Sequence, residues 1–277
     1  RSPDGQPGGV PTAFPADVFE MAWSVFFLLE AGFDLDAIAP QAIEAIRAHL
    51  GASLGPTGAG FGCGAGLPPD VDDTAMVIAI LRRLGMSPSL DALWTFHAGD
   101  HFAIFAHERT SSPSANAHVL EALAGQRQPR SANACDQVVE YLCACQERDG
   151  TWRDKWSISP YYATMSCALA LARVAETRVH PRLHLSVRWV LVSQQTDGGW
   201  GYAASSPEET AYSLLILRRL GDIIRQPDTI QQAIQRGRAY LWHHPAALED
   251  GPCLWVDKDL YRPDTVIHAA VFAALHE

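Results

Sequence analysis

The chain has 277 residues, of which 48% are hydrophobic and 19% charged, and its formal net charge at pH 7 is -10. This length and apolar content are enough for one large domain or two small ones, and they argue against extensive disorder. The negative charge argues against nucleic acid or an anionic membrane surface as the default partner, because both favour a basic protein face.

The six cysteines show neither the density of a secreted disulfide framework nor a metal or redox spacing, and most lie among apolar residues. No signal peptide opens the chain, and no apolar run approaches the roughly 20 residues of a membrane-spanning helix. We therefore expect buried free thiols in a protein of the reducing cytoplasm.

Residues 1–14 are rich in proline and glycine and predict a linker or loop leader. Apolar residues recur at helical spacing from Val18 to Phe27, with Asp17 as a plausible cap, so ordered structure is expected from residue 15. The sequence shows no clear period-2 strand. It predicts one all-helical domain over residues 15–277.

An internal repeat organises this domain. A Pro or acidic cap precedes a helix start with Thr or Asn at positions 74, 116, 164, 210 and 265, which are separated by 42, 48, 46 and 55 residues. Each interval has room for two helices, so the repeats predict a tandem array of helical hairpins. Two Gln-x-x-Asp-Gly-x-Trp loops, residues 146–152 and 194–200, are expected to clasp neighbouring repeats. Such hairpins bury a continuous inner surface when they close into an α/α toroid, with alternate helices inside and outside.

Three carboxylates are crowded into Asp70-Val71-Asp72-Asp73, where a glycine-rich loop meets an apolar helix. Like charges this close cannot all ionise cheaply, so one carboxyl is expected to stay protonated and to act as a strong proton donor. The alternative is that the three acids only cap the helix and complement its dipole. In the toroid they would lie at the mouth of an inner helix.

From about Pro11 to Leu275 the chain resembles class II terpene cyclases, specifically bacterial diterpene cyclases of the copalyl diphosphate synthase type. The resemblance is carried by Asp70-Val71-Asp72-Asp73-Thr74-Ala75, by the two Gln-x-x-Asp-Gly-x-Trp loops, by residues 14–20 and by residues 152–162. It implies that residues 15–277 form the α/α-barrel β domain of such an enzyme, which carries the Asp-x-Asp-Asp motif.

The resemblance also implies a reaction. Asp72 would protonate the terminal alkene of geranylgeranyl diphosphate, with Asp70 and Asp73 tuning it, and two rings would close before a base removes a proton with the diphosphate intact. The product would be a copalyl diphosphate of the ent series, with a halimadane-type, drimane-type or other bicyclic diphosphate as the alternative. Asn116 matches the position of a family residue that hydrogen-bonds the acid, although it could equally cap its own helix.

A carbocation needs walls that neither quench nor hydrate it, and aromatic faces meet both demands. The candidates are Trp23, Tyr161, Tyr162 and Trp255, although each of them could serve only as core packing.

The matching segment 152–156 supplies Lys155 and Trp156 as candidate contacts of the substrate, with Lys155 placed to bind the diphosphate. A surface ion pair between Lys155 and Asp154 is the competing interpretation.

The chain departs from the family in two ways. Thr12 replaces an Asn that positions the terminal base in the plant ent-specific enzymes, so the base and the product stereochemistry stay open. The second, γ domain is absent from this chain. We therefore expect a fragment that is inactive or nearly so by itself. The missing part would supply an acidic motif linked to Mg²⁺ and one N-terminal helix that completes the toroid.

Other toroid proteins fit less well. Protein prenyltransferase β-subunits need a zinc ligand set, and neither Cys63 nor Cys253 has convincing companions. Residues 62–66 begin like a thioester loop but lack the Gln that forms the bond. Squalene-type triterpene cyclases share the acid motif but are larger. A non-catalytic helical binding module would explain the repeats, but it would give no function to the three neighbouring carboxylates.

Overall fold

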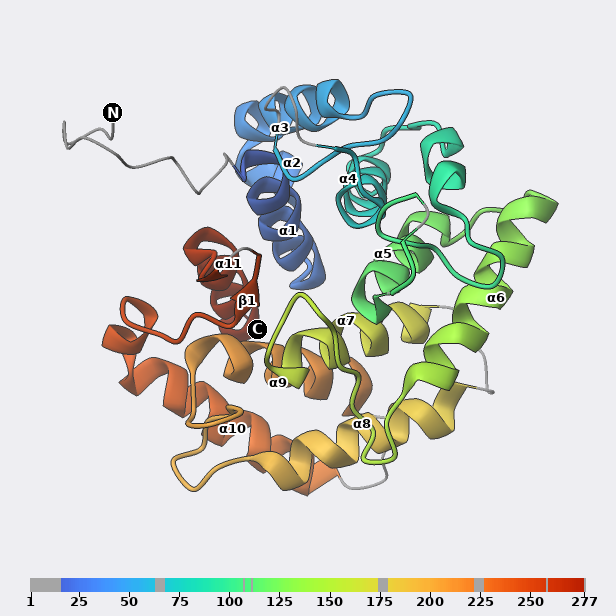
Figure 1. The fold of residues 1–277 in the computed structure, drawn as a ribbon. Helices are drawn as coiled ribbons and strands as arrows, with labels where there is room; N and C mark the ends of the chain where they lie inside the picture. Colours follow the sequence, from blue (N-terminus) through green and yellow to red (C-terminus); the bar gives the residue numbers. More distant parts are fainter. Residues whose placement is uncertain are drawn as a thin grey trace, which may run out of the picture.

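The computed structural model describes residues 16–62, 68–106, 108–110, 112–173, 179–221, 227–257 and 259–276. The predicted leader, residues 1–14, and Cys63 lie outside these ranges. The described chain is mainly helical, as expected (Figure 1). Its elements are α1 (Asp17–Glu30), α2 (Leu35–Ile38), α3 (Pro40–Ser53), α4 (Val71–Arg83), η1 (Asp91–Phe96), α5 (Pro113–Leu123), α6 (Pro129–Cys145), α7 (Pro160–Arg173), α8 (His180–Ser193), α9 (Pro207–Leu220), α10 (Pro227–His243), η4 (Pro245–Leu248), β1 (Trp255–Val256), β2 (Leu260–Tyr261) and α11 (Asp264–Leu275).

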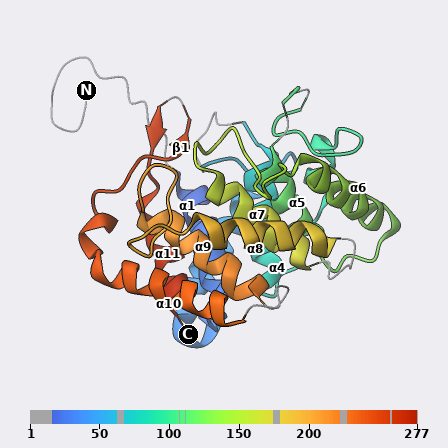
Figure 2. The same ribbon diagram turned by 90° about the horizontal axis from the view of Figure 1, so that it is seen from below.

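Six helices form a closed inner ring. Each packs against two neighbours, in the order α1, α4, α5, α7, α9, α11 and back to α1. Outside this ring, α3 packs on α1 and α4, α6 on α5, α8 on α7 and α9, and α10 on α9 and α11. Figures 1 and 2 show α6, α8 and α10 wrapping the ring from outside. The predicted α/α toroid is confirmed.

The inner helices run in parallel, and the contacts at their two ends show this. At one end, the first turns of α4 and α7 and the second turn of α5 meet through Asp72, Tyr162 and His118. At the other end, the last turns of α1, α4, α5 and α7 meet in a network of ion pairs. Arg173 pairs with both Glu30 and Glu121, and Arg83 Nη1 lies 2.6 Å from Glu30 Oε1. These arginines complement the negative ends of the helix dipoles.

The inner helices α4, α5, α7 and α9 all begin with the same hydrogen-bonded contact, which we call the clasp. A Thr or Asn side chain accepts a hydrogen bond from the backbone N–H of one residue in the preceding loop, over 2.9–3.0 Å, and donates to the carbonyl of that residue. The four pairs are Thr74 with Ala59, Asn116 with Phe102, Thr164 with Trp152, and Thr210 with Trp200. The clasp fixes the rotation of each of these four inner helices against its loop.

The two Gln-x-x-Asp-Gly-x-Trp loops do what the sequence predicts. The indoles of Trp152 and Trp200 are fully buried and donate to the carbonyls of Leu142 and Val190 over 2.7 Å. The amides of Gln146 and Gln194 bridge to the next outer helix, at the carbonyls of Arg182 and Ala233. Both loops therefore hold successive hairpins together.

Two expectations need correction. The inner ring closes within the described residues, and the extra helix expected from the missing part stays a prediction. A short antiparallel hairpin of β1 and β2 interrupts the helical pattern before α11 and projects at one end of the ring (Figure 2). The thiol of Cys167 is buried as expected, whereas Cys253 is exposed. Among the described residues, no helix combines the length and apolar character needed to cross a bilayer.

Gly237 of α10 tests the packing of a clasp. An added Cβ would lie 2.4 Å from Cζ3 of the Trp200 ring and 3.0 Å from Cδ2 of Leu214. Although Ala is normally the better helix former, we expect Gly237→Ala to lower the free energy of unfolding by about 1–3 kcal/mol through overpacking.

Gly51 in α3 is the matched control, because an added Cβ there meets no described atom within 4 Å. Gly51→Ala should raise the free energy of unfolding by about 0.5–1 kcal/mol. Urea denaturation of both variants measures the difference, and an equal response of the two would contradict the packing described for Trp200.

Candidate active site

The three acids stand at the first turn of α4, and only one of them caps it. Asp70 is the N-cap, and its side chain accepts a hydrogen bond from the backbone N–H of Asp73 over 2.8 Å. The backbone N–H groups of Asp70 and Val71 donate to the carbonyls of Ala59 and Ile104, which anchors the turn to two loops. The capping interpretation therefore accounts for Asp70 and leaves Asp72 and Asp73 available for other roles.

Burial separates the three carboxyls. Asp70 and Asp73 are 8% and 4% exposed, whereas 20% of the Asp72 side chain is exposed. Burial raises the pKa of Asp70 to about 7, although its hydrogen bond with Asp73 opposes the shift. Burial, and secondarily the charge of Asp70, raises the pKa of Asp73 well above its usual range. Burial therefore favours the protonated forms of Asp70 and Asp73, and Asp72 is the most accessible of the three acids.

His118 of α5 is the closest partner of Asp72, and the sequence analysis did not identify it. Its Nδ1 lies 2.5 Å from Asp72 Oδ1, and the imidazole is 2% exposed. Its Nε2 lies 3.5 Å from the hydroxyl of Tyr162, which accepts a hydrogen bond from Trp23 Nε1 over 2.5 Å. A chain of polar contacts thus runs from the exposed acid into the interior of the ring.

The repeat contains a signal that could have found His118. The inward position on α4 is Asp72, two residues before the clasp residue Thr74. The corresponding position on α5 is Ser114, two residues before Asn116. His118 follows Ser114 by four residues, so both lie on the same helix face one turn apart. A histidine one turn along the inward face is therefore expected to reach the acid on the neighbouring helix.

Asn116 does not contact the acid in the way predicted. Its Oδ1 accepts from the N–H of Phe102, and its Nδ2 donates to the carbonyls of Phe102 and Ser112, each over 2.9 Å. Both amide hydrogens are thus used in the clasp, and His118 stands beside Asp72 instead. The capping alternative does not hold either, because the N-cap of α5 is Ser112, whose side chain accepts a hydrogen bond from the N–H of Ala115.

Three of the four predicted aromatic residues gather beside the acid. Trp23, Tyr162 and Trp255 are 1–3% exposed, and the ring centroids of Tyr162 and Trp255 are 4.4 Å apart. Trp23 meets the His118 ring edge-on at 5.1 Å. Phe19 joins the group, 4.6 Å from Trp23 and 5.3 Å from Trp255.

Tyr161 is the exception among the predicted aromatic residues. Its ring packs on Trp189 of α8, with a centroid separation of 4.5 Å, so it lies between the inner and outer layers. Consecutive residues of a helix point about 100° apart, which explains why Tyr162 faces inward and Tyr161 does not. Its predicted role as a wall of the site is corrected to core packing.

The segment 152–156 lies against the start of α5 through Asp154. This half-buried carboxylate accepts from the hydroxyls of Ser112 and Ser114 over 2.6 and 2.9 Å, and its other oxygen accepts from Trp156 N–H over 3.1 Å. Burial raises its pKa. The competing interpretation paired Lys155 with Asp154, but Lys155 pairs with Glu108 instead.

Lys155 and Trp156 lie together at the edge of the site. The Lys155 ammonium stands 5.1 Å from the centroid of the Trp156 ring, and it donates to the carbonyl of Thr110 over 3.0 Å. Its side chain is 28% exposed. A diphosphate would have to compete with Glu108 for this cation.

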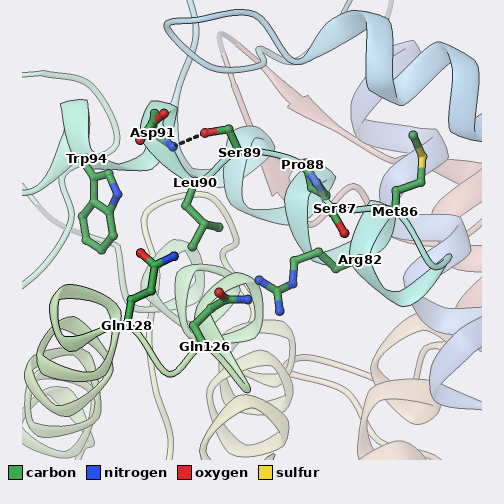
Figure 3. A pocket seen from close by; sticks show the side chains of 10 residues that line it. All are labelled: Arg82, Met86, Ser87, Pro88, Ser89, Leu90, Asp91, Trp94, Gln126 and Gln128. Atoms are coloured by element: carbon green, nitrogen blue, oxygen red, sulfur yellow. Dashed lines mark hydrogen bonds between the residues drawn. The ribbon is translucent and has the colours of Figure 1, made fainter.

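A separate pocket of about 500 Å³ lies at the opposite end of α4 (Figure 3). Figure 3 shows Arg82, Leu90, Trp94 and Gln126 around it. Arg82 follows Asp72 by ten residues, a rise of about 15 Å along the helix. This pocket is therefore distinct from the acid site.

Comparisons with known proteins agree with this geometry. The family described as squalene-hopene cyclase C-terminal domain matches residues 99–215. An ent-copalyl diphosphate synthase of Streptomyces sp. (strain KO-3988) is 42% identical over 93% of this chain and 49% of its own length. A copalyl diphosphate synthase of Streptomyces cyslabdanicus is 36% identical over 97% of this chain and 50% of its own.

A solved structure extends the likeness to the fold. The ent-copalyl diphosphate synthase from Streptomyces platensis is 38% identical with a TM-score of 0.85, over 97% of this chain and 52% of that protein. The chain thus spans about half the length of the curated relatives it matches.

The clasp role of Asn116 is directly testable. Asn116→Ala would leave the buried N–H and carbonyl of Phe102 unpaired, so we expect the free energy of unfolding to fall by about 2–3 kcal/mol. Asn116→Thr places the side chain used by the other three clasps and should recover part of that loss. Urea denaturation measures both, and an Ala variant as stable as the parent chain would contradict the role.

The raised pKa values predict a stability that falls with rising pH. Folded Asp70 keeps its proton up to about pH 7, whereas the unfolded chain releases it near its usual pKa, about 4. The folded state thus binds more protons in this window, and its stability, complete below about pH 4, is lost as the pH rises through about 7.

Asp73→Asn removes one buried carboxyl of the same kind. We expect this variant to exceed the parent chain in unfolding free energy at pH 8 by about 1–3 kcal/mol, with the gain shrinking toward pH 4. Asp228→Asn, an exposed first-turn acid on the outer helix α10, is the control and should follow the parent chain. A constant gain for Asp73→Asn across pH would contradict the titration.

Proposed function

This chain belongs to the class II diterpene cyclases, and we propose that it is the proton-donating domain of an enzyme that cyclises geranylgeranyl diphosphate with the diphosphate retained. The single observation that carries the proposal is Asp72, the most accessible member of a turn of three carboxyls, held by His118 beside buried aromatic residues. We propose a copalyl diphosphate of the ent series as the product, which the 42% identity to an ent-copalyl diphosphate synthase favours.

Asp72 is the proposed general acid. His118 Nδ1 contacts Oδ1, which leaves Oδ2 to carry the proton to the terminal alkene carbon. An N–H donated from His118 to Oδ1 would stabilise the carboxylate that forms when the proton leaves. Burial raises the pKa of both Asp70 and Asp73, which lie within the same turn, so less negative charge accumulates beside Asp72 near neutral pH.

The aromatic group would stabilise the cation that follows. Trp23, Tyr162 and Trp255 present faces and edges from three different elements, and each favourable cation–π contact contributes about 0.5–2 kcal/mol. Their burial would also exclude the water that would quench the cation before both rings close.

Lys155 and Trp156 stay proposed contacts of the substrate, on the strength of the family resemblance and their position at the edge of the site. Lys155 would exchange Glu108 for the diphosphate. The proposed Mg²⁺ would neutralise charge on the diphosphate. Among the described residues, no group of three or more His, Cys, Asp or Glu side chains is arranged to hold a metal ion. We propose that its ligands lie mainly in the γ domain of the whole protein, as the family resemblance implies. We propose the cytoplasm as the compartment.

Variants of the whole protein test the acid. We expect Asp72→Asn to lower turnover of geranylgeranyl diphosphate roughly 1,000-fold, because the proton donor is lost while the shape is kept. His118→Phe should lower it by a smaller factor, roughly 10–100-fold, because the carboxyl stays but loses its partner. Phosphatase-treated products are identified by mass spectrometry and chiral chromatography, and Asp228→Asn serves as the control.

The same assay separates the alternatives. A bicyclic C20 alcohol that disappears with Asp72→Asn supports the proposal, and its chirality assigns the series or shows another skeleton. Substrate left unchanged by the whole protein, with geranyl and farnesyl diphosphates also inert, would favour a non-catalytic toroid. The 277-residue chain alone is expected to give no product, and robust turnover by it would contradict its proposed dependence on a second domain.

A further inference from the structure

A second carboxylate occupies the same repeat position as Asp72 on the opposite side of the ring. Asp72 and Glu208 are each the second residue of an inner helix and each lie two residues before the clasp threonine, Thr74 or Thr210. In the ring order, α4 and α9 are three places apart among six helices and therefore face each other. The internal repeat thus places two carboxylates across the ring, at the end where the helices begin.

Glu208 is buried, and only one of its two carboxylate oxygens has a hydrogen-bond partner among the described residues. It is 4% exposed, and its Oε1 accepts from Trp255 Nε1 over 2.7 Å and from the Tyr212 hydroxyl over 3.1 Å. Within the described part of the chain, Oε2 has no hydrogen-bond partner. Burial raises the pKa of Glu208 to about 7, with Glu209 adding to the shift and Arg262 opposing it. A carboxylate with such a pKa is suited to accept a proton near neutral pH.

The neighbouring Glu209 shows what a structural glutamate looks like in this turn. Its Oε1 accepts from Ser159 Oγ over 2.6 Å and from the Tyr202 N–H over 2.8 Å, and its Oε2 accepts from Ser206 Oγ over 2.7 Å. The Ser206 hydroxyl also accepts from the Glu209 N–H, as the N-cap of α9. Both oxygens of Glu209 are therefore used in folding, whereas Oε2 of Glu208 is not.

Aromatic side chains connect the two carboxylates. Trp255, which donates to Glu208, packs on Tyr162 at 4.4 Å, and Tyr212 lies 5.7 Å from the same ring. Tyr162 in turn contacts His118, the partner of Asp72. Glu208 therefore stands at the far side of the same wall that would guide the cation.

We propose that Glu208 is the terminal base of the cyclisation, with Oε2 as the atom that receives the proton. This inference rests on the proposed function. The Asp72 O–H bond breaks, and the alkene electron pair takes the proton as a new C–H bond. Two further alkene pairs close the rings. A C–H bond beside the last cationic carbon then breaks, its pair becomes a C=C bond, and its proton forms an O–H bond on Oε2.

The step balances as an isomerisation. The substrate gains one proton and loses one, the diphosphate is untouched, and the protein moves a proton from Asp72 to Glu208. Exchange with solvent restores both groups between turnovers, and no oxidant or other co-reactant is needed.

The test uses the whole protein with geranylgeranyl diphosphate. Glu208→Gln keeps the shape and the acceptor for Trp255 but cannot take up the proton. We expect turnover to fall at least tenfold and the parent product to drop below half of the mixture. Hydroxylated or rearranged bicyclic diphosphates should replace it, because a cation without its base is captured by water or rearranges.

Controls separate this role from folding and from the acid. Glu44→Gln, an exposed change in α3, should leave rate and products unaltered. Glu208→Asp keeps the charge but withdraws it by one methylene, so its product mixture should be intermediate. Far-UV circular dichroism and thermal melting establish that each variant is folded, and Glu208→Asp carries the test if Glu208→Gln does not fold.

Two results would overturn the proposal. One is a folded Glu208→Gln protein with parent-like rate and products. The other is a lower rate with an unchanged product mixture, which would make Glu208 only a support of the wall. Failure of the cyclase function itself is distinguishable, because Asp72→Asn would then match the parent protein in the same assay.

Discussion

The clasp at the start of α4, α5, α7 and α9 is the constraint on which the site depends. One Thr or Asn side chain holds both backbone groups of a single loop residue, so the helix cannot rotate against its loop. The residue two positions earlier therefore points inward in each repeat. This geometry puts Asp72, Ser114, Tyr162 and Glu208 on equivalent positions around one end of the ring. The backbone arrangement is the same in these repeats, and they differ in the side chain that each has two residues before the clasp residue. That side chain decides what each repeat contributes to the proposed reaction.

The parallel ring also divides the electrostatics between its two ends. The helix N-termini, with their partial positive charge, face the carboxylates of Asp70 to Asp73 and of Glu208 and Glu209. The C-termini carry Arg83 and Arg173, which are locked to Glu30 and Glu121. One end therefore tolerates buried carboxyls that burial alone would make costly. The other end is closed by ion pairs, where half-buried charges satisfy one another.

The sequence predicts the toroid and the acid turn, because both depend on patterns of residues that lie close together in the chain or recur at a regular interval. The clasp residues recur at a readable interval, and three acids lie within four positions. Contacts between different helices cannot be read from such local patterns, because they depend on which helices lie next to each other in the fold. His118 meets Asp72 only after α4 and α5 are packed side by side, and Lys155 finds Glu108 rather than the adjacent Asp154. Tyr161 and Tyr162 look alike in sequence, and only the helix rotation separates them.

Asn116 shows how the repeat could have corrected the prediction made for it. It was singled out because it aligns with an acid-binding residue of the family, yet it also occupies the clasp position held by Thr in three other repeats. The clasp already uses both of its amide hydrogens. Because the amide hydrogens of Asn116 are already bonded within the fold, they are not available to the substrate. One carboxylate oxygen of Glu208, in contrast, has no hydrogen-bond partner among the described residues. In a repeated fold, hydrogen bonds therefore separate structural residues from candidate catalytic residues. Side chains whose polar atoms are all bonded to the loop have a structural role. Buried polar atoms on the inward face that have no hydrogen-bond partner are the candidates for catalysis.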